Sequence, residues 1–94
     1  MVKIALAESA WDDLDSITDY IALDSIRYAQ EFSDRLFERI EQLKSFPQSG
    51  RVVPEFKNEL LRELIISKYR IVYRIFENEK IVILRIIHGA KLLE

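Results

Sequence analysis

Residues 69–76 read Tyr-Arg-Ile-Val-Tyr-Arg-Ile-Phe, and this stretch decides the fold. β-branched and aromatic residues dominate it, and successive side chains of a strand point to opposite faces of a sheet. One face of the predicted strand carries the residues that we expect in the core: Tyr69, Ile71, Tyr73 and Ile75. The other face carries Arg70, Val72, Arg74 and Phe76. The pattern therefore predicts a middle strand with one apolar face and one partly charged face.

Two further strands are predicted on either side of this one in the sequence. Residues 60–66 and 81–88 are rich in Ile, Leu and Val, and polar interruptions at Lys68 and residues 77–80 separate the segments at hairpin spacing. Hairpins of this length join antiparallel neighbours, so an antiparallel meander is expected. Residues 2–6 alternate in the same way, which predicts a short first strand whose place in the sheet the sequence leaves open.

Two amphipathic helices are predicted between the first strand and the meander. The first begins near Ser9, which together with Asp12 resembles a capping box. Its apolar stripe is Ala10, Leu14, Ile17 and Ile21. Ser25 is expected to cap the second helix, whose apolar stripe is Ala29, Phe32, Leu36, Ile40 and Leu43. Proline and glycine then end the hairpin, and residues 47–59 form the longest connection.

The predicted order of elements is strand, helix, helix, strand, strand, strand. This order predicts an α+β fold, in which an antiparallel sheet carries a helical hairpin on one face. The chain has 94 residues, of which 49% are hydrophobic. If these residues were divided between two cores, each core would be too small to bury enough apolar surface. A single domain over residues 1–94 is therefore expected.

Composition excludes several classes of function. With no Cys and a single His, neither a thiol nucleophile nor a zinc site of the usual composition is available, so no metal and no cofactor are expected. Because no apolar run is long enough to span a membrane, a cytoplasmic protein is expected. The net charge of -2 hides an asymmetry: residues 1–50 hold five Lys/Arg against ten Asp/Glu, and residues 51–94 hold nine against six. The basic second half favours an anionic partner.

The sheet face away from the helices is a candidate partner surface. If residues 81–88 alternate strictly, Ile83, Arg85 and Ile87 lie on this face. The predicted surface is then Arg70, Val72, Arg74, Phe76, Ile83, Arg85 and Ile87. An exposed apolar patch rimmed by arginines is typical of a groove for a partner chain.

Short segments spread along residues 3–92 resemble those of one protein family. They are Ala10, Asp13-Leu14, Ile17 and Tyr20-Ile21; Ala29 and Phe32; Phe46-Pro47 with Gly50-Arg51; Leu61-Arg62-Glu63-Leu64; Tyr69 to Ile75; and Ile87-His88-Gly89. In this order and at these separations the chain resembles the RelE/ParE toxins of type II toxin–antitoxin systems, which contribute to plasmid stabilisation. The resemblance implies the fold predicted above and an antitoxin partner whose C-terminal segment wraps across the toxin.

The resemblance implies two possible activities. ParE-like members inhibit DNA gyrase without chemistry of their own, and the run from Tyr69 to Ile75 with the His88-Gly89 ending is more similar to that branch. We expect Lys91 to belong to the antitoxin-binding or target-binding surface together with the sheet-face residues named above. Leu92 and Leu93 are its neighbours in the sequence. RelE-like members are ribosome-dependent, metal-independent endoribonucleases that cut mRNA.

The nuclease alternative needs a base, cations and an acid around the ribose and phosphate. The positions that match the family's nuclease residues are Glu55, Arg62, Arg70 and His88. Against this alternative, no lysine-rich segment precedes the sheet, and the chain is acidic overall. Two of these residues also have a structural interpretation: His88 as a hydrogen-bonded packing histidine and Arg62 in an ion pair. A third alternative is a non-toxic relic that only binds its antitoxin.

Overall fold

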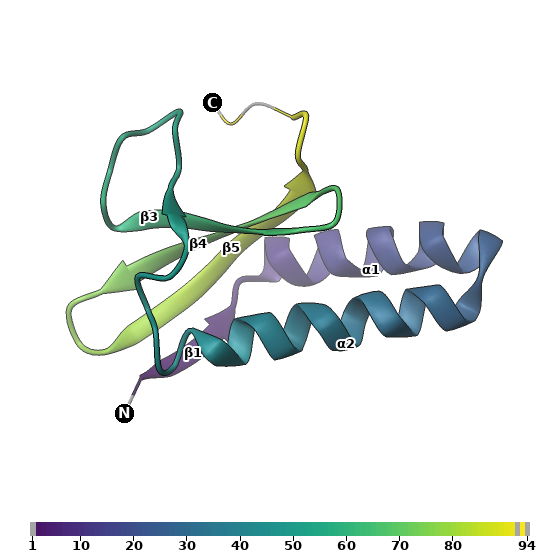
Figure 1. The fold of residues 1–94 in the computed structure, drawn as a ribbon, viewed down its shortest axis with the longest axis horizontal. Coiled ribbons are helices and arrows are strands. Elements are labelled where there is room, and N and C mark those ends of the chain that lie inside the picture. Colours follow the sequence, from purple (N-terminus) through teal and green to yellow (C-terminus); the bar gives the residue numbers. More distant parts are fainter. Residues whose placement is uncertain (1, 92, 94) are drawn as a thin grey trace.

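The strand built from residues 69–76 lies in the middle of the sheet, as predicted. The structure is a computed structural model that describes residues 2–91 and 93. Its elements are β1 (Lys3–Leu6), α1 (Glu8–Asp24), α2 (Ile26–Gln42), β2 (Arg51–Val52), β3 (Leu61–Ile66), β4 (Tyr69–Phe76) and β5 (Lys80–His88). The five-stranded sheet has the order β1-β5-β4-β3-β2, and α1 and α2 pack side by side on one of its faces (Figure 1).

The sheet confirms the predicted meander and answers the question that the sequence left open. β4 pairs antiparallel with β3 on one side and with β5 on the other. β1 pairs with the other side of β5, in parallel, and forms one edge of the sheet. The short edge strand β2 was not predicted, since it lies inside the 47–59 connection and pairs with β3 over two residues only.

Both predicted helix stripes lie against the sheet. The core contains Ala10 and Leu14 from α1 and Phe32, Leu36 and Ile40 from α2. Opposite them lie the inward residues of the sheet: Leu64, Ile66, Ile71, Tyr73, Ile81, Ile83 and Ile86. This arrangement buries the apolar face of every long element, which is the main stabilising contribution to a domain of this size. No helix within residues 2–91 is long and apolar enough to cross a membrane.

The two predicted helix caps have different outcomes. Ser25 does cap α2, because its hydroxyl accepts a hydrogen bond from the Tyr28 N–H. The capping box at Ser9 is wrong: α1 begins at Glu8 after an Ala7 cap without a side-chain hydrogen bond. The Ser9 hydroxyl instead donates to the carbonyl of Leu84 in β5. Ser9 therefore fastens α1 to the part of β5 that extends beyond β1.

A β-bulge in β5 overturns one predicted position. Val72 faces Arg85 and Tyr73 faces Ile83, so Leu84 has no residue opposite it in β4. The extra residue shifts the alternation of β5, because side chains on either side of a bulge differ in phase from a regular strand. Ile83 consequently lies fully buried in the core under the helices, and its predicted place on the partner surface is wrong.

Tyr73 holds the chain segment that leaves α2. Its hydroxyl donates to the Pro47 carbonyl at 2.8 Å and accepts from the Gly50 N–H at 3.0 Å. Burial raises the pKa of Tyr73, which keeps the hydroxyl protonated as a donor. A side chain at Gly50 would bring its Cβ to 2.6 Å from the Tyr73 hydroxyl, so this close approach requires glycine.

We expect Tyr73→Phe to lower the free energy of unfolding by about 1–3 kcal/mol, because the buried Gly50 N–H and the partly buried Pro47 carbonyl lose their partner. Urea unfolding followed by circular dichroism measures the change. Tyr20→Phe is the matched control, since Tyr20 is exposed, and its effect should stay within about 0.5 kcal/mol. Equal stability of the two variants would show that the Tyr73 hydroxyl does not hold the segment.

Candidate functional site

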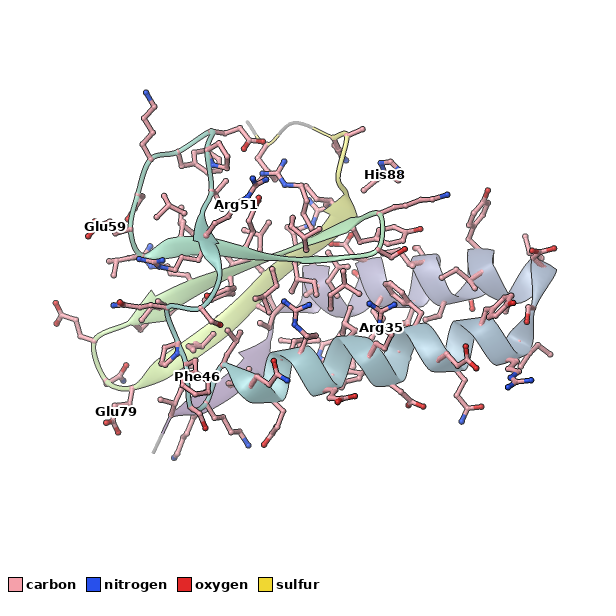
Figure 2. The ribbon with its side chains drawn as sticks, in the orientation of Figure 1. Arg35, Phe46, Arg51, Glu59, Glu79 and His88 are labelled. Carbon is pink, nitrogen blue, oxygen red and sulfur yellow. The ribbon has the colours of Figure 1, made fainter. Side chains whose placement is uncertain are left out.

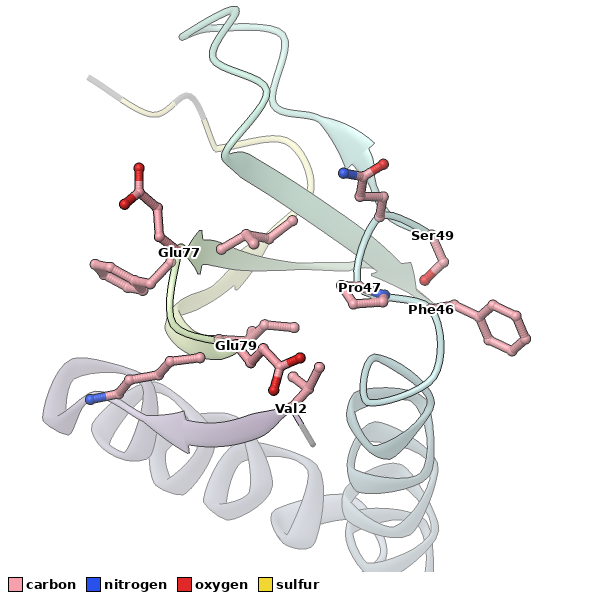
Figure 3. A pocket seen from close by; sticks show the side chains of 11 residues that line it. Val2, Phe46, Pro47, Ser49, Glu77 and Glu79 are labelled. Carbon is pink, nitrogen blue, oxygen red and sulfur yellow. The ribbon is translucent and has the colours of Figure 1, made fainter.

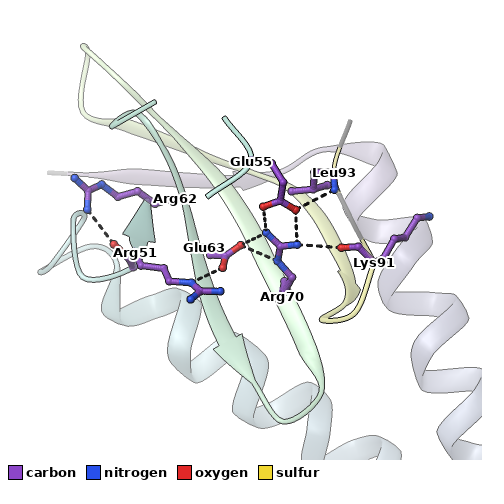
Figure 4. A network of polar contacts seen from close by, with 8 residues as sticks. Arg51, Glu55, Arg62, Glu63, Arg70, Lys91 and Leu93 are labelled. Atoms are coloured by element: carbon purple, nitrogen blue, oxygen red, sulfur yellow. Dashed lines mark hydrogen bonds and ion pairs between the residues drawn. The ribbon is translucent and has the colours of Figure 1, made fainter. Parts of the chain in front are cut away.

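An ion-pair network centred on Arg70 lies on the sheet face away from the helices (Figure 4). The Arg70 guanidinium donates from Nε to Glu63 at 2.8 Å and from both terminal nitrogens to the two oxygens of Glu55, each at 2.8 Å. Nη1 also donates to the Lys91 carbonyl, and Glu55 accepts from the Leu93 N–H. We call this set the Arg70 network.

The network neutralises charges that the fold has removed from water. Arg70 is 5% exposed and Glu63 is 1% exposed, and buried charges of this kind require paired, hydrogen-bonded partners. The hydrogen bonds to Glu55 and Glu63 raise the pKa of Arg70 further above its ordinary value. The same contact with Arg70, aided by the Leu93 N–H, lowers the pKa of Glu55 from 4.5 to about 2. Arg51 supplies a second cation to Glu63 from the edge of the sheet.

The four candidate nuclease residues do not form one site. Glu55 and Arg70 contact each other on the open side of the sheet. Arg62 faces Tyr73 and His88 faces Tyr69, so both lie on the helix side. Tyr69 and Tyr73 are four residues apart in β4, which separates Arg62 from His88 by about 13 Å along the strands. The sheet itself lies between the two pairs.

Arg62 and His88 have structural partners. The Arg62 guanidinium donates to the backbone carbonyls of Glu59, Gly50 and Gln48, so its structural role is not the ion pair considered above. It therefore braces the loop on either side of β2. The His88 ring lies edge-on to Tyr69, and its Nδ1 accepts a hydrogen bond from the Ala90 N–H. His88 is therefore hydrogen-bonded, as its structural interpretation predicts, but it is exposed at the end of β5 and not buried in the core (Figure 2).

Much of the predicted partner surface is covered by the chain itself. Figure 1 shows the loop after β2 and the C-terminal segment on the side of the sheet opposite the helices. Arg70, Val72 and Ile87 are buried there, so they are not exposed as predicted. Arg85 is bound to Asp13 of α1 through two hydrogen bonds, because the start of α1 covers the edge of β5. Lys91 is exposed as expected, and Leu92 lies outside the described residues.

The remaining part of this face, beside the turn between β4 and β5, is open. Strand register places these residues on it: Lys3, Ala5, Leu61, Arg74, Phe76, Lys80 and Val82. Lys3 lies opposite Lys80, and the Arg74 guanidinium lies 4.8 Å from the centre of the Phe76 ring. Like charges placed opposite each other destabilise a sheet, so an anionic partner here would relieve a cost. We call these residues the open sheet face.

Sequence reasoning found Arg74 and Phe76 but missed the two lysines of this face. Lys80 was assigned to a turn, and Lys3 to a strand of unknown position. Their juxtaposition depends on the parallel pairing of β1 with β5, for which the sequence carries no signal.

A hollow of about 660 Å³ adjoins the open sheet face (Figure 3). Its lining includes the apolar residues Val2, Pro47, Ile75, Phe76 and Ile81 and the charged residues Glu77, Glu79 and Lys80. Phe46 also lines the hollow, and Figure 3 shows its ring extending outward from it. Val2, Ile75 and Ile81 pack toward the core on the helix side of the sheet, whereas Phe76 and Lys80 lie on the open sheet face, so the two features meet only at the end of the β4–β5 hairpin. Within residues 2–91 and 93, acidic and His side chains form no cluster that could hold a metal ion.

Similar folds occur among solved toxin–antitoxin systems. The chromosomal ParDE system from P. aeruginosa matches with a TM-score of 0.75 and 24% identity over 94% of this chain and 96% of that chain. The RelBE2 toxin–antitoxin complex from Mycobacterium tuberculosis matches with a TM-score of 0.58 and 20% identity over 93% of this chain and 96% of that chain. At these identities both similarities concern the fold.

Comparison of the sequence itself gives the family. No curated protein sequence matches at a significant level. The family model described as the ParE toxin of the type II toxin–antitoxin system parDE matches residues 4–93. Since that match spans nearly the whole chain, and the fold is the one found in the ParDE system, the chain belongs to the ParE toxin family of type II toxin–antitoxin systems.

Proposed function

We propose that this toxin acts by binding and inhibiting DNA gyrase, without a reaction of its own, and that a cognate antitoxin neutralises it in the cytoplasm. The observation that carries the non-enzymatic part is the Arg70 network, in which two residues of the nuclease alternative, Glu55 and Arg70, are bound to each other. Membership in the ParE toxin family supports the gyrase part, because the ParE-like members that the sequence resembles inhibit this enzyme. Plasmid stabilisation is the corresponding biological role.

Two features weigh against ribosome-dependent RNA cleavage. A general base works best when its pKa lies near the operating pH, and the pKa of Glu55 is lowered to about 2. Stabilising a phosphorane needs free N–H donors directed at the phosphate. The donors of Arg70 point to Glu55, Glu63 and the Lys91 carbonyl instead.

The open sheet face is the proposed antitoxin surface. It joins the cations of Lys3, Arg74 and Lys80 with the exposed Phe76 ring. An antitoxin segment with alternating apolar and acidic residues matches both properties. One buried apolar anchor would contribute about 1.5–3 kcal/mol. The similar ParDE and RelBE2 structures are themselves toxin–antitoxin systems, which supports a partner of this class.

Purified toxin incubated with gyrase and supercoiled plasmid should accumulate cleaved gyrase–DNA complexes, because a ParE-like inhibitor traps the enzyme on DNA. Addition of the antitoxin from the adjacent gene should prevent this. If no cleaved complexes form at excess toxin, gyrase is not the target. Codon-positioned 5′ ends in cellular transcripts after induction would then indicate a nuclease, and unaffected growth would indicate a relic that only binds its antitoxin.

Glu55→Gln should remove a pH-dependent contribution to stability. The folded pKa of Glu55 lies below its ordinary 4.5, so the ionised carboxylate stabilises the folded state above pH 4.5, and this contribution disappears as the pH falls toward 2. Urea unfolding at several pH values should therefore show wild type more stable than Glu55→Gln at pH 7, with the difference shrinking below pH 4.5. Glu38→Gln, which changes an exposed carboxylate of α2, is the control. A difference independent of pH would contradict the assigned ion pair.

Phe76→Asp should weaken antitoxin binding at least about tenfold, or 1.4 kcal/mol. The substitution removes an exposed apolar contact and places a carboxylate where an acidic segment is expected to bind. Calorimetry measures the affinity, and circular dichroism checks that the helical hairpin stays folded. Leu23→Asp changes another exposed apolar residue, at the far end of the hairpin, and should leave the affinity unchanged. An unchanged affinity for Phe76→Asp would place the antitoxin elsewhere.

A further inference from the structure

The far end of the helical hairpin exposes four large apolar residues. They are Tyr20, Leu23, Ile26 and Tyr28, with 72%, 86%, 77% and 63% of their surfaces exposed. Figure 1 shows why: α1 and α2 extend well beyond the sheet, and the turn between them lies at the free end of the pair. We call this group the hairpin tip.

The fold does not account for these side chains. The positions that join the helices at this end are filled by Ile21, Ala29 and Phe32, which face the core. Side chains of the hairpin tip point elsewhere, and a shallow hollow lies among Tyr20, Leu23, Asp24 and Tyr28. Gathered apolar surface of this kind on a small protein is typical of an interaction site.

The charges around the hairpin tip indicate the chemistry of its partner. Every charged residue of α1 is acidic. Among the described residues, Asp13 is the α1 carboxylate that forms an ion pair, with Arg85, whereas Asp15, Asp19 and Asp24 are exposed. Arg27, the nearest cation, pairs with Glu31. Two copies of this surface would repel each other, so charge complementarity favours a basic partner over a second copy of the chain.

We propose that the hairpin tip is the surface that docks onto gyrase, at a site where apolar side chains are surrounded by lysine and arginine. This inference rests on the proposed function. An enzyme that binds DNA carries basic surface to neutralise phosphates, and an acidic helix ending in exposed apolar residues complements such a surface. The toxin then carries two separate interaction surfaces of opposite charge: the hairpin tip for its target and the open sheet face for its antitoxin.

Separate surfaces are compatible with neutralisation because the toxin is small. Its extents are 40 × 30 × 21 Å, so an antitoxin on the open sheet face lies within a few tens of ångströms of an enzyme docked at the hairpin tip. A partner as large as gyrase approaches both surfaces at once. Steric exclusion by the antitoxin is then sufficient, and the two binding sites need not overlap.

Single substitutions on the full chain test the proposal. Leu23→Asp and Tyr28→Asp remove apolar contacts from the hairpin tip, and Asp19→Lys reverses a charge beside it. The concentration of toxin that gives half-maximal cleaved complex with gyrase and supercoiled plasmid should rise at least about tenfold for Leu23→Asp and Tyr28→Asp, and severalfold for Asp19→Lys. Phe46→Asp is the matched control, since Phe46 is 66% exposed beyond the opposite end of α2. Circular dichroism and calorimetry with the antitoxin should be unchanged for every variant.

The outcomes separate this inference from the function on which it rests. Wild-type potency in all three tip variants would overturn the docking site and leave gyrase inhibition standing. A wild-type chain with no effect on gyrase would overturn both. If light scattering shows a wild-type dimer that Leu23→Asp converts to monomers, the hairpin tip joins two copies of the toxin, and the proposal is wrong.

Discussion

The burial of the Arg70 guanidinium between Glu55 and Glu63 is the constraint on which the open side of this protein depends. A charge in that position cannot remain unpaired, because its desolvation would cost several kcal/mol. Glu55 lies in the loop after β2, and Glu63 lies in β3. The Lys91 carbonyl accepts a hydrogen bond from Arg70, and the Leu93 N–H donates one to Glu55. One side chain of β4 thereby fixes two segments that have no regular secondary structure of their own.

This constraint divides the face of the sheet into two parts with different properties. Over the Arg70 network the chain covers Val72 and Ile87, and the charges there are satisfied internally. Among the described residues, no loop or terminal segment covers the part of this face beside the turn between β4 and β5. Arg74, Phe76 and Lys80 are therefore exposed there. Glu55 and Arg70, two of the residues that resemble nuclease positions, thus bind each other, and the proposed antitoxin surface is the half of the sheet that the loop does not reach.

The helical hairpin contributes a surface of the opposite kind. Its inner stripes fill the core, while its outer face is acidic and ends in exposed aromatic and aliphatic side chains. The charge asymmetry of the sequence, acidic in its first half and basic in its second, corresponds to two physical layers that meet at Asp13 and Arg85. Opposite charges on the two sides suit a protein that meets one acidic and one basic partner.

The sequence by itself determined the element types, the antiparallel meander and both helix stripes, because periodicity reports which face of each element must leave water. It also determined that Tyr73 and Ile71 are core residues. Only the tertiary structure decided the parallel pairing of β1, the bulge that moves Ile83 into the core, and the partners of Arg70. The physical reason is that alternation describes a residue relative to its own strand, whereas register, loop paths and ion pairs depend on residues tens of positions away.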